Sequence, residues 1–144
     1  MIKKIKELFM PVLIAGVFIG GLVLMFTGNN GSGGGNTIQV IVPELTALGE
    51  EGKVLFDASC ASCHGDNAAG SDRAPPLVHD IYNPGHHGDE AFVRAAMNGV
   101  RAHHWAFGNM PAITNVTEDD VLKIIRYVRE LQVANGIATV EHIM

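Results

Sequence analysis

The residue types and spacing in Cys60-Ala61-Ser62-Cys63-His64 suit the attachment of a metal-containing cofactor. Two thiols three positions apart, with a histidine directly after the second, form the attachment signature of c-type haem. Each thiol can add across one vinyl group of the porphyrin, and on a short helical turn both sulfurs reach from one side. The histidine then offers an imidazole nitrogen as an axial ligand to the iron. The motif therefore predicts one covalent haem c, held by Cys60, Cys63 and His64.

Three other uses of the cysteine pair stay open at the level of sequence. A disulfide between Cys60 and Cys63 suits an oxidising compartment, but it leaves His64 without a role. A thioredoxin-like redox pair expects a strand before the motif, whereas residues 52–59 have a helical pattern. A zinc site could combine the two thiols with two distant histidines, which the pairs His86-His87 and His103-His104 could supply.

Composition limits the architecture and the partners. The 144 residues suffice for one compact domain with an accessory segment. The formal net charge is −5, and no basic cluster occurs in the domain, so nucleic acid is not an expected partner. Both cysteines belong to the motif, which leaves none for a disulfide framework.

An uncharged stretch near the N-terminus predicts a membrane anchor. Residues 8–27 carry no charge, and as a helix they would be about 30 Å long, which matches the core of a bilayer. Lysines precede this stretch at positions 3, 4 and 6, and the next basic residue is Lys53. The positive-inside rule then places residues 1–7 in the cytoplasm and the rest outside. A cleaved signal peptide is the alternative, although its hydrophobic region is usually shorter.

The remainder divides into a linker and a helical domain. Residues 28–37 form a glycine-rich linker, and residues 38–144 form the domain. Helices are predicted over residues 48–60 and 89–97, the second ending at Asn98-Gly99. A third begins after Thr117, a suitable N-cap, and ends at Asn135-Gly136. The long irregular stretch 65–88 makes sense if it wraps around a large cofactor.

From Gly49 to about Asn135 the order of these features resembles the class I monohaem c-type cytochromes, the mitochondrial-cytochrome-c-like class. In that family a helix leads into Cys-x-x-Cys-His, a proline loop and a methionine ligand follow, and a C-terminal helix crosses the first. The resemblance implies an all-α cytochrome c-like haem domain. It also implies that Tyr127 of the last helix packs against Gly52 of the first, where the absence of a side chain permits close approach.

Further cofactor-binding residues follow from the same resemblance. Ala74-Pro75-Pro76-Leu77 matches the family's Pro-x-Leu loop. The Pro75 carbonyl would then accept a hydrogen bond from the His64 imidazole, and Leu77 would pack on the porphyrin. Trp105 and Phe107 would line the haem crevice, and the Trp105 indole could donate to a haem propionate or simply be buried.

The sixth iron ligand is predicted to be Met110, because Asn109-Met110-Pro111 matches the family's Met-Pro motif between the last two helices. A thioether is a soft ligand that favours ferrous iron. Met97 is a weaker candidate because it lies on a predicted helix stripe. His103 and His104 are rivals that would lower the potential.

The resemblance implies a one-electron carrier with no catalytic residue, passing electrons between membrane or periplasmic redox proteins. With the predicted anchor in the lipid bilayer, it would be a single-pass protein of the bacterial inner membrane whose haem domain faces the periplasm. The part beyond residue 27 carries 14 acidic and 7 basic residues, which suits a partner with a basic patch. The alternatives are a fixed cytochrome subunit of a respiratory or photosynthetic complex, and a haem sensor or peroxidase-like protein with an open sixth position.

Overall fold

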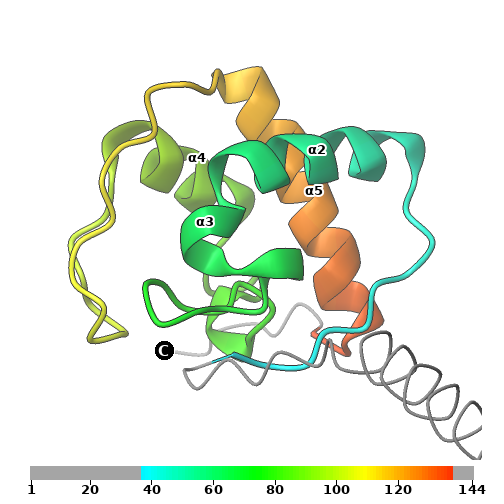
Figure 1. Cartoon of the computed structure of the whole chain (residues 1–144), viewed down its shortest axis with the longest axis horizontal. Helices are drawn as coiled ribbons and strands as arrows, with labels where there is room; N and C mark the ends of the chain where they lie inside the picture. Colours follow the sequence, from blue (N-terminus) through cyan, green and yellow to red (C-terminus); the bar gives the residue numbers. More distant parts are fainter. Residues whose placement is uncertain (1–36, 138–144) are drawn as a thin grey trace, which may run out of the picture. The chain divides into compact units, whose positions relative to one another are not determined.

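The computed structural model describes residues 37–137, which form a helical domain (Figure 1). Its helices, in chain order, are α2 (Ala47–Ser59), α3 (Ala61–His64), the 3-10 helices η1 (Asp66–Ala68) and η2 (Asp80–Tyr82), α4 (Asp89–Asn98) and α5 (Glu118–Ala134). Within this range the β-structure is one isolated bridge between Val100 and Met110. The predicted helical class is therefore confirmed.

The predicted anchor, residues 8–27, lies outside the described residues, as does most of the predicted linker. Between residues 37 and 137, no helix combines the length and hydrophobicity needed to cross a bilayer.

The ends of the long helices agree with the predictions from sequence. The Thr46 hydroxyl accepts a hydrogen bond from the Gly49 N–H at the start of α2. At the start of α5, Thr117 and Asp120 form a reciprocal capping box, each side chain accepting from the other's backbone N–H. Gly99 ends α4 with a φ of 78°, a conformation that glycine adopts without strain.

The crossing of α2 and α5 organises the domain (Figure 1). A Cβ added to Gly52 would lie 2.0 Å from the Lys123 carbonyl oxygen and 3.0 Å from the Tyr127 Cβ, so the two helices approach too closely for any side chain there. The Tyr127 ring is fully buried, with its centroid 5.5 Å from that of Phe56. The packing predicted for Tyr127 and Gly52 is confirmed.

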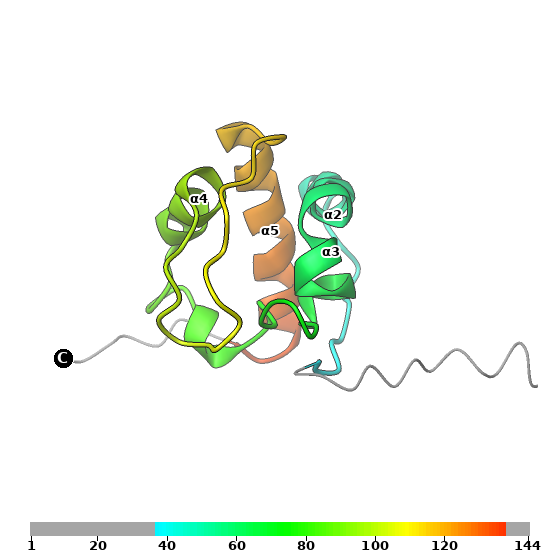
Figure 2. The same ribbon diagram turned by 60° about the vertical axis from the view of Figure 1, so that its left-hand side comes forward.

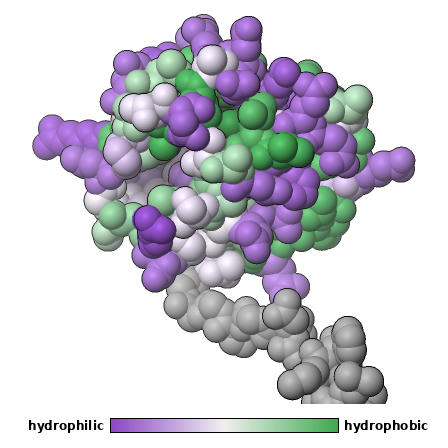
Figure 3. All heavy atoms as spheres, turned by 45° about the horizontal axis from the view of Figure 1, so that its top comes forward, coloured by the Kyte–Doolittle hydropathy of each residue, from purple (hydrophilic) through white to green (hydrophobic). Residues whose placement is uncertain are grey.

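The core depends on which face of each helix is turned inward. The α2 helix buries Gly49, Gly52 and Phe56, which lie on one stripe of a helix with 3.6 residues per turn. The sequence pattern predicts an apolar side of this helix formed by Val54, Leu55 and Phe56. Val54 instead lies on the opposite face and is 68% exposed, so its place in that prediction was wrong. Met97 was likewise expected in a packed stripe but is 39% exposed. Hydrophobic side chains thus reach the surface between hydrophilic ones, as Figure 3 shows for one face.

Candidate functional site

A cavity of about 760 Å³ lies within the domain. Its walls come from the end of α2, α3, the proline loop, the inner face of α4, the segment between α4 and α5, and α5. Figure 2 shows the segment after α4 (yellow) running down one side of the domain, with α3 (green) on the other. All seven residues predicted to bind the cofactor line this cavity, from Cys60 to Met110.

The two cysteines lie where α2 gives way to α3. Both thiols are free and partly buried, so they do not form a disulfide. Burial, with a further contribution from Cys63, raises the pKa of the Cys60 thiol to about 11. A redox pair of the thioredoxin kind requires a lowered thiol pKa, and here it is raised. The arrangement instead presents two free thiols to the cavity.

His64 ends α3 with its ring oriented by a backbone acceptor. Its Nδ1 lies 2.9 Å from the Pro75 carbonyl oxygen, so the hydrogen bond that the family resemblance implies is present. Donation from Nδ1 leaves Nε2 as the nitrogen with a free lone pair. Burial lowers the pKa of this imidazole, partly opposed by the Pro75 bond, and so favours the neutral form that binds metals.

The chain must reverse sharply after His64 to bring Pro75 to it. Gly65 has a φ of 74°, and a Cβ there would lie 2.1 Å from the Gly70 carbonyl oxygen. The Leu77 N–H then donates to the Ala68 carbonyl at 2.9 Å. This tight loop positions both Pro75 and Leu77 on the cavity wall.

Met110 reaches the cavity on a segment that is fixed at both ends. Val100 and Met110 exchange two backbone hydrogen bonds of 2.9 Å, which close residues 101–109 into a loop beside the end of α4. The Ala102 N–H also donates to the Asn109 side chain at 3.0 Å. Of the two methionines in the described range, Met110 lines the cavity, whereas Met97 is exposed and does not. This difference supports Met110 as the sixth ligand.

Trp105 provides a test of whether a polar cofactor fits. Among the described residues, its indole Nε1 is the buried side-chain nitrogen or oxygen without a hydrogen-bond partner. Burial raises the pKa of the Tyr82 phenol, and the nearby Trp105 indole partly opposes this rise. The indole N–H nevertheless forms no aligned hydrogen bond. A buried N–H normally has an acceptor. An acidic group on a molecule in the cavity would supply one, so these residues fit a haem.

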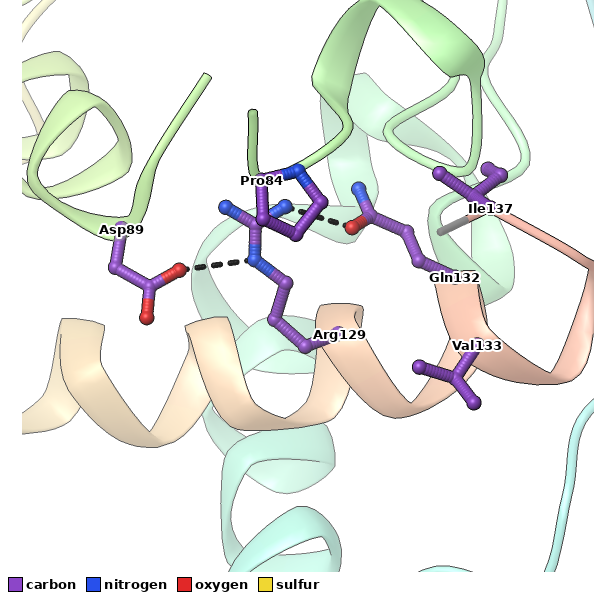
Figure 4. Close-up of a pocket in the computed structure, with 6 residues that line it drawn as sticks. All are labelled: Pro84, Asp89, Arg129, Gln132, Val133 and Ile137. Atoms are coloured by element: carbon purple, nitrogen blue, oxygen red, sulfur yellow. Dashed lines mark hydrogen bonds and ion pairs between the residues drawn. The ribbon is translucent and has the colours of Figure 1, made fainter. Parts of the chain in front are cut away.

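The chain between η2 and α4 is held by Arg129 of α5, which sequence reasoning missed (Figure 4). Its guanidinium forms an ion pair with Asp89 at 2.9 Å and donates to the carbonyls of Tyr82 and His87 at 2.7 and 2.6 Å. The neighbouring Gln132 side chain is buried and donates to the Leu77 carbonyl at 2.8 Å. No pattern in the sequence identifies these backbone acceptors, because they lie more than 40 residues away along the chain.

The zinc alternative for the cysteines is not supported within residues 37–137. The group of side chains there that could hold a metal consists of His86, His87 and His104, and it contains neither cysteine.

Taken together, the helical fold and the cavity between the thiols, His64 and Met110 define a haem-binding domain of the c type. A family model for cytochrome c matches residues 49–132, more than half of the chain. The chain belongs to the cytochrome c family and is a class I c-type cytochrome, as the sequence resemblance implied.

A curated relative provides a second comparison. The cbb3-type cytochrome c oxidase subunit CcoP of Azospirillum brasilense is 37% identical over 92 residues. The matched region is 59% of this chain and 29% of the relative, so the chain spans less than a third of that protein's length.

Proposed function

We propose that this protein is a one-electron carrier with a single haem c, which Cys60 and Cys63 would hold covalently and whose iron His64 and Met110 would ligate. The observation that carries the proposal is that these four side chains all line one cavity, three of them from the junction of α2 and α3 and Met110 from the segment between α4 and α5. When bound, the haem supplies an iron that alternates between the ferrous and ferric states.

The residues of the chain have distinct tasks in this proposal. The hydrogen bond to Pro75 sets the orientation of the His64 ring and increases its basicity. The Met110 thioether favours the ferrous state, and its pinned backbone keeps the sulfur at the cavity. The Trp105 N–H, which has no hydrogen-bond partner within residues 37–137, would donate to an acidic group of the haem. Apolar lining side chains such as Leu77 exclude water.

The absorption spectrum of the oxidised protein tests this function. With both axial positions occupied by protein groups, the ferric haem is expected to be low-spin and to bind added azide weakly. A high-spin spectrum with ready azide binding would contradict the carrier function and favour a sensor or peroxidase-like protein.

We further propose that residues 8–27 anchor the chain in the inner membrane, with residues 1–7 in the cytoplasm and the domain of residues 38–144 at the periplasmic face. The support is the uncharged stretch and the lysines on one side of it. As a flexible coil, the nine residues 28–36 of the predicted linker would span roughly 16 Å. Such a tether gives the haem an effective concentration near membrane partners that reaches the millimolar range.

The similarity to an oxidase subunit favours a second candidate, a fixed subunit of a respiratory complex. Deleting residues 1–36 and adding a cleavable signal separates the two candidates. For a tethered carrier, we expect a soluble cytochrome with an unchanged spectrum, whose slower reaction with membrane partners recovers when it is added in excess. If a salt wash releases the native protein from membranes, the proposed anchor is wrong.

Native sizing after gentle detergent extraction completes this comparison. A free carrier migrates as a small species. Stable co-migration with an oxidase, combined with no recovery on adding the truncated form in excess, would contradict the shuttle and support the fixed subunit.

A further inference from the structure

Four histidines from two separate segments come together in the lining of the cavity. His86 and His87 follow η2, whereas His103 and His104 lie on the loop that Val100 and Met110 close. The ring centroids of His86 and His104 are 5.3 Å apart, and those of His87 and His104 are 5.1 Å apart. His86, His87 and His104 each contribute one ring nitrogen to a group whose members all lie within 4.8 Å of one another. We call these three residues the histidine cluster.

We propose that the histidine cluster binds a divalent transition metal ion of the Zn²⁺ or Cu²⁺ kind, at a site separate from the haem ligands. Imidazole is a preferred ligand of these ions, and three imidazoles leave a further coordination position for water.

The spacing of the nitrogens is suitable for coordination. The Nε2 atoms of His86 and His104 are 3.4 Å apart. Two nitrogens bound to one zinc at the usual bond length, in tetrahedral geometry, are about 3.3–3.4 Å apart. The two side chains thus already have the separation that a shared metal ion requires.

His87 has its ring oriented in the way typical of metal ligands. Its Nδ1 lies 2.7 Å from the Ile81 carbonyl oxygen. Donation to this carbonyl fixes the tautomer and leaves Nε2 with its lone pair. The Arg129 guanidinium holds the His87 backbone carbonyl at 2.6 Å, so the position of the residue is also set from α5.

The local charges permit a cation. The nearby positive charge of Arg129 is paired with Asp89 at 2.9 Å. The net charge of the chain, −5, also attracts cations.

Metal binding at this cluster would cross-link two parts of the cavity wall. His86 and His87 belong to the segment between η2 and α4, and His104 belongs to the loop that ends at Met110. A shared ion therefore joins this loop to the segment that Arg129 holds against α5.

Isothermal titration of the full-length protein, purified without a histidine tag, with ZnCl₂ tests the site. We expect one Zn²⁺ per chain and no binding of Mg²⁺, a hard cation that prefers oxygen ligands. Zn²⁺ binding should weaken by at least about 10-fold in each of the variants His86→Gln, His87→Gln and His104→Gln. Loss of a residue that only hydrogen-bonds a metal ligand already weakens binding by about this factor, and loss of the ligand itself should do no less. His103→Gln is the matched control from the same loop and should retain binding.

Two further measurements keep the result independent of folding. An unchanged visible spectrum shows that each variant retains its haem environment. In the reduced protein, Zn²⁺ should shift the ring ¹⁵N signals of the three cluster residues and slow amide exchange in residues 101–109. Retained binding in His104→Gln, equal loss in His103→Gln, or no slowing of exchange would each overturn the proposal.

Discussion

Replacing both Cys60 and Cys63 by serine is expected to abolish covalent haem attachment. Each thioether needs a sulfur, and these are the two cysteines in the sequence. Both thiols line the cavity beside His64 and are unpaired with each other. Denaturing electrophoresis followed by a haem-peroxidase stain should show a band for the native protein and none for the double variant.

Single substitutions in the motif test whether the loss of staining is specific to the two sulfurs. Each single serine variant keeps one possible thioether, so we expect reduced but detectable staining. Ser62→Ala changes one of the two residues between the attachment positions without removing a sulfur, and its band should persist. A stained band at full intensity in the double variant would mean that haem is not attached through these thiols.

Replacing Met110 by alanine is expected to convert a closed haem site into an open one. Loss of the thioether removes a ligand that favours ferrous iron, so the reduction potential should fall by at least about 0.1 V, within the range that axial ligands control. The charge-transfer band of the iron–thioether bond should disappear. External ligands such as azide should then bind, which the visible spectrum records.

Met97→Ala is the matched control for this change. Met97 is 39% exposed and does not line the cavity, so its removal should leave the potential and the spectrum unchanged. If Met97→Ala has these effects and Met110→Ala does not, the assignment of the sulfur is wrong. If the native oxidised protein is low-spin but lacks the charge-transfer band, His103 or His104 becomes the candidate ligand.

Short-range patterns were sufficient for much of the fold and for the candidate haem ligands. Helix ends depend on the few residues at each terminus, so Thr117 and the Gly99 stop could be recognised directly. The attachment motif depends on spacing within five residues. Hydrophobic spacing was less reliable, because it does not show which face of a helix finds a partner. Val54 and Met97 were misplaced for this reason.

Contacts between distant segments could not be predicted in this way. The carbonyls that Arg129 and Gln132 bind lie more than 40 residues away, and any exposed carbonyl looks the same in the sequence. The histidine pairs were visible as pairs, but nothing local indicated that they face each other.

The sequence by itself therefore determined the class of cofactor and predicted Cys60, Cys63 and His64 as residues that would hold it, because covalent attachment depends on local spacing. Only the tertiary structure decided that His86 and His104 lie close together and that Met110, rather than Met97, lines the cavity. The packing of α5 against α2 and the closure of residues 101–109 by Val100 and Met110 are long-range events. They bring together side chains whose separation along the chain carries no signal of their contact.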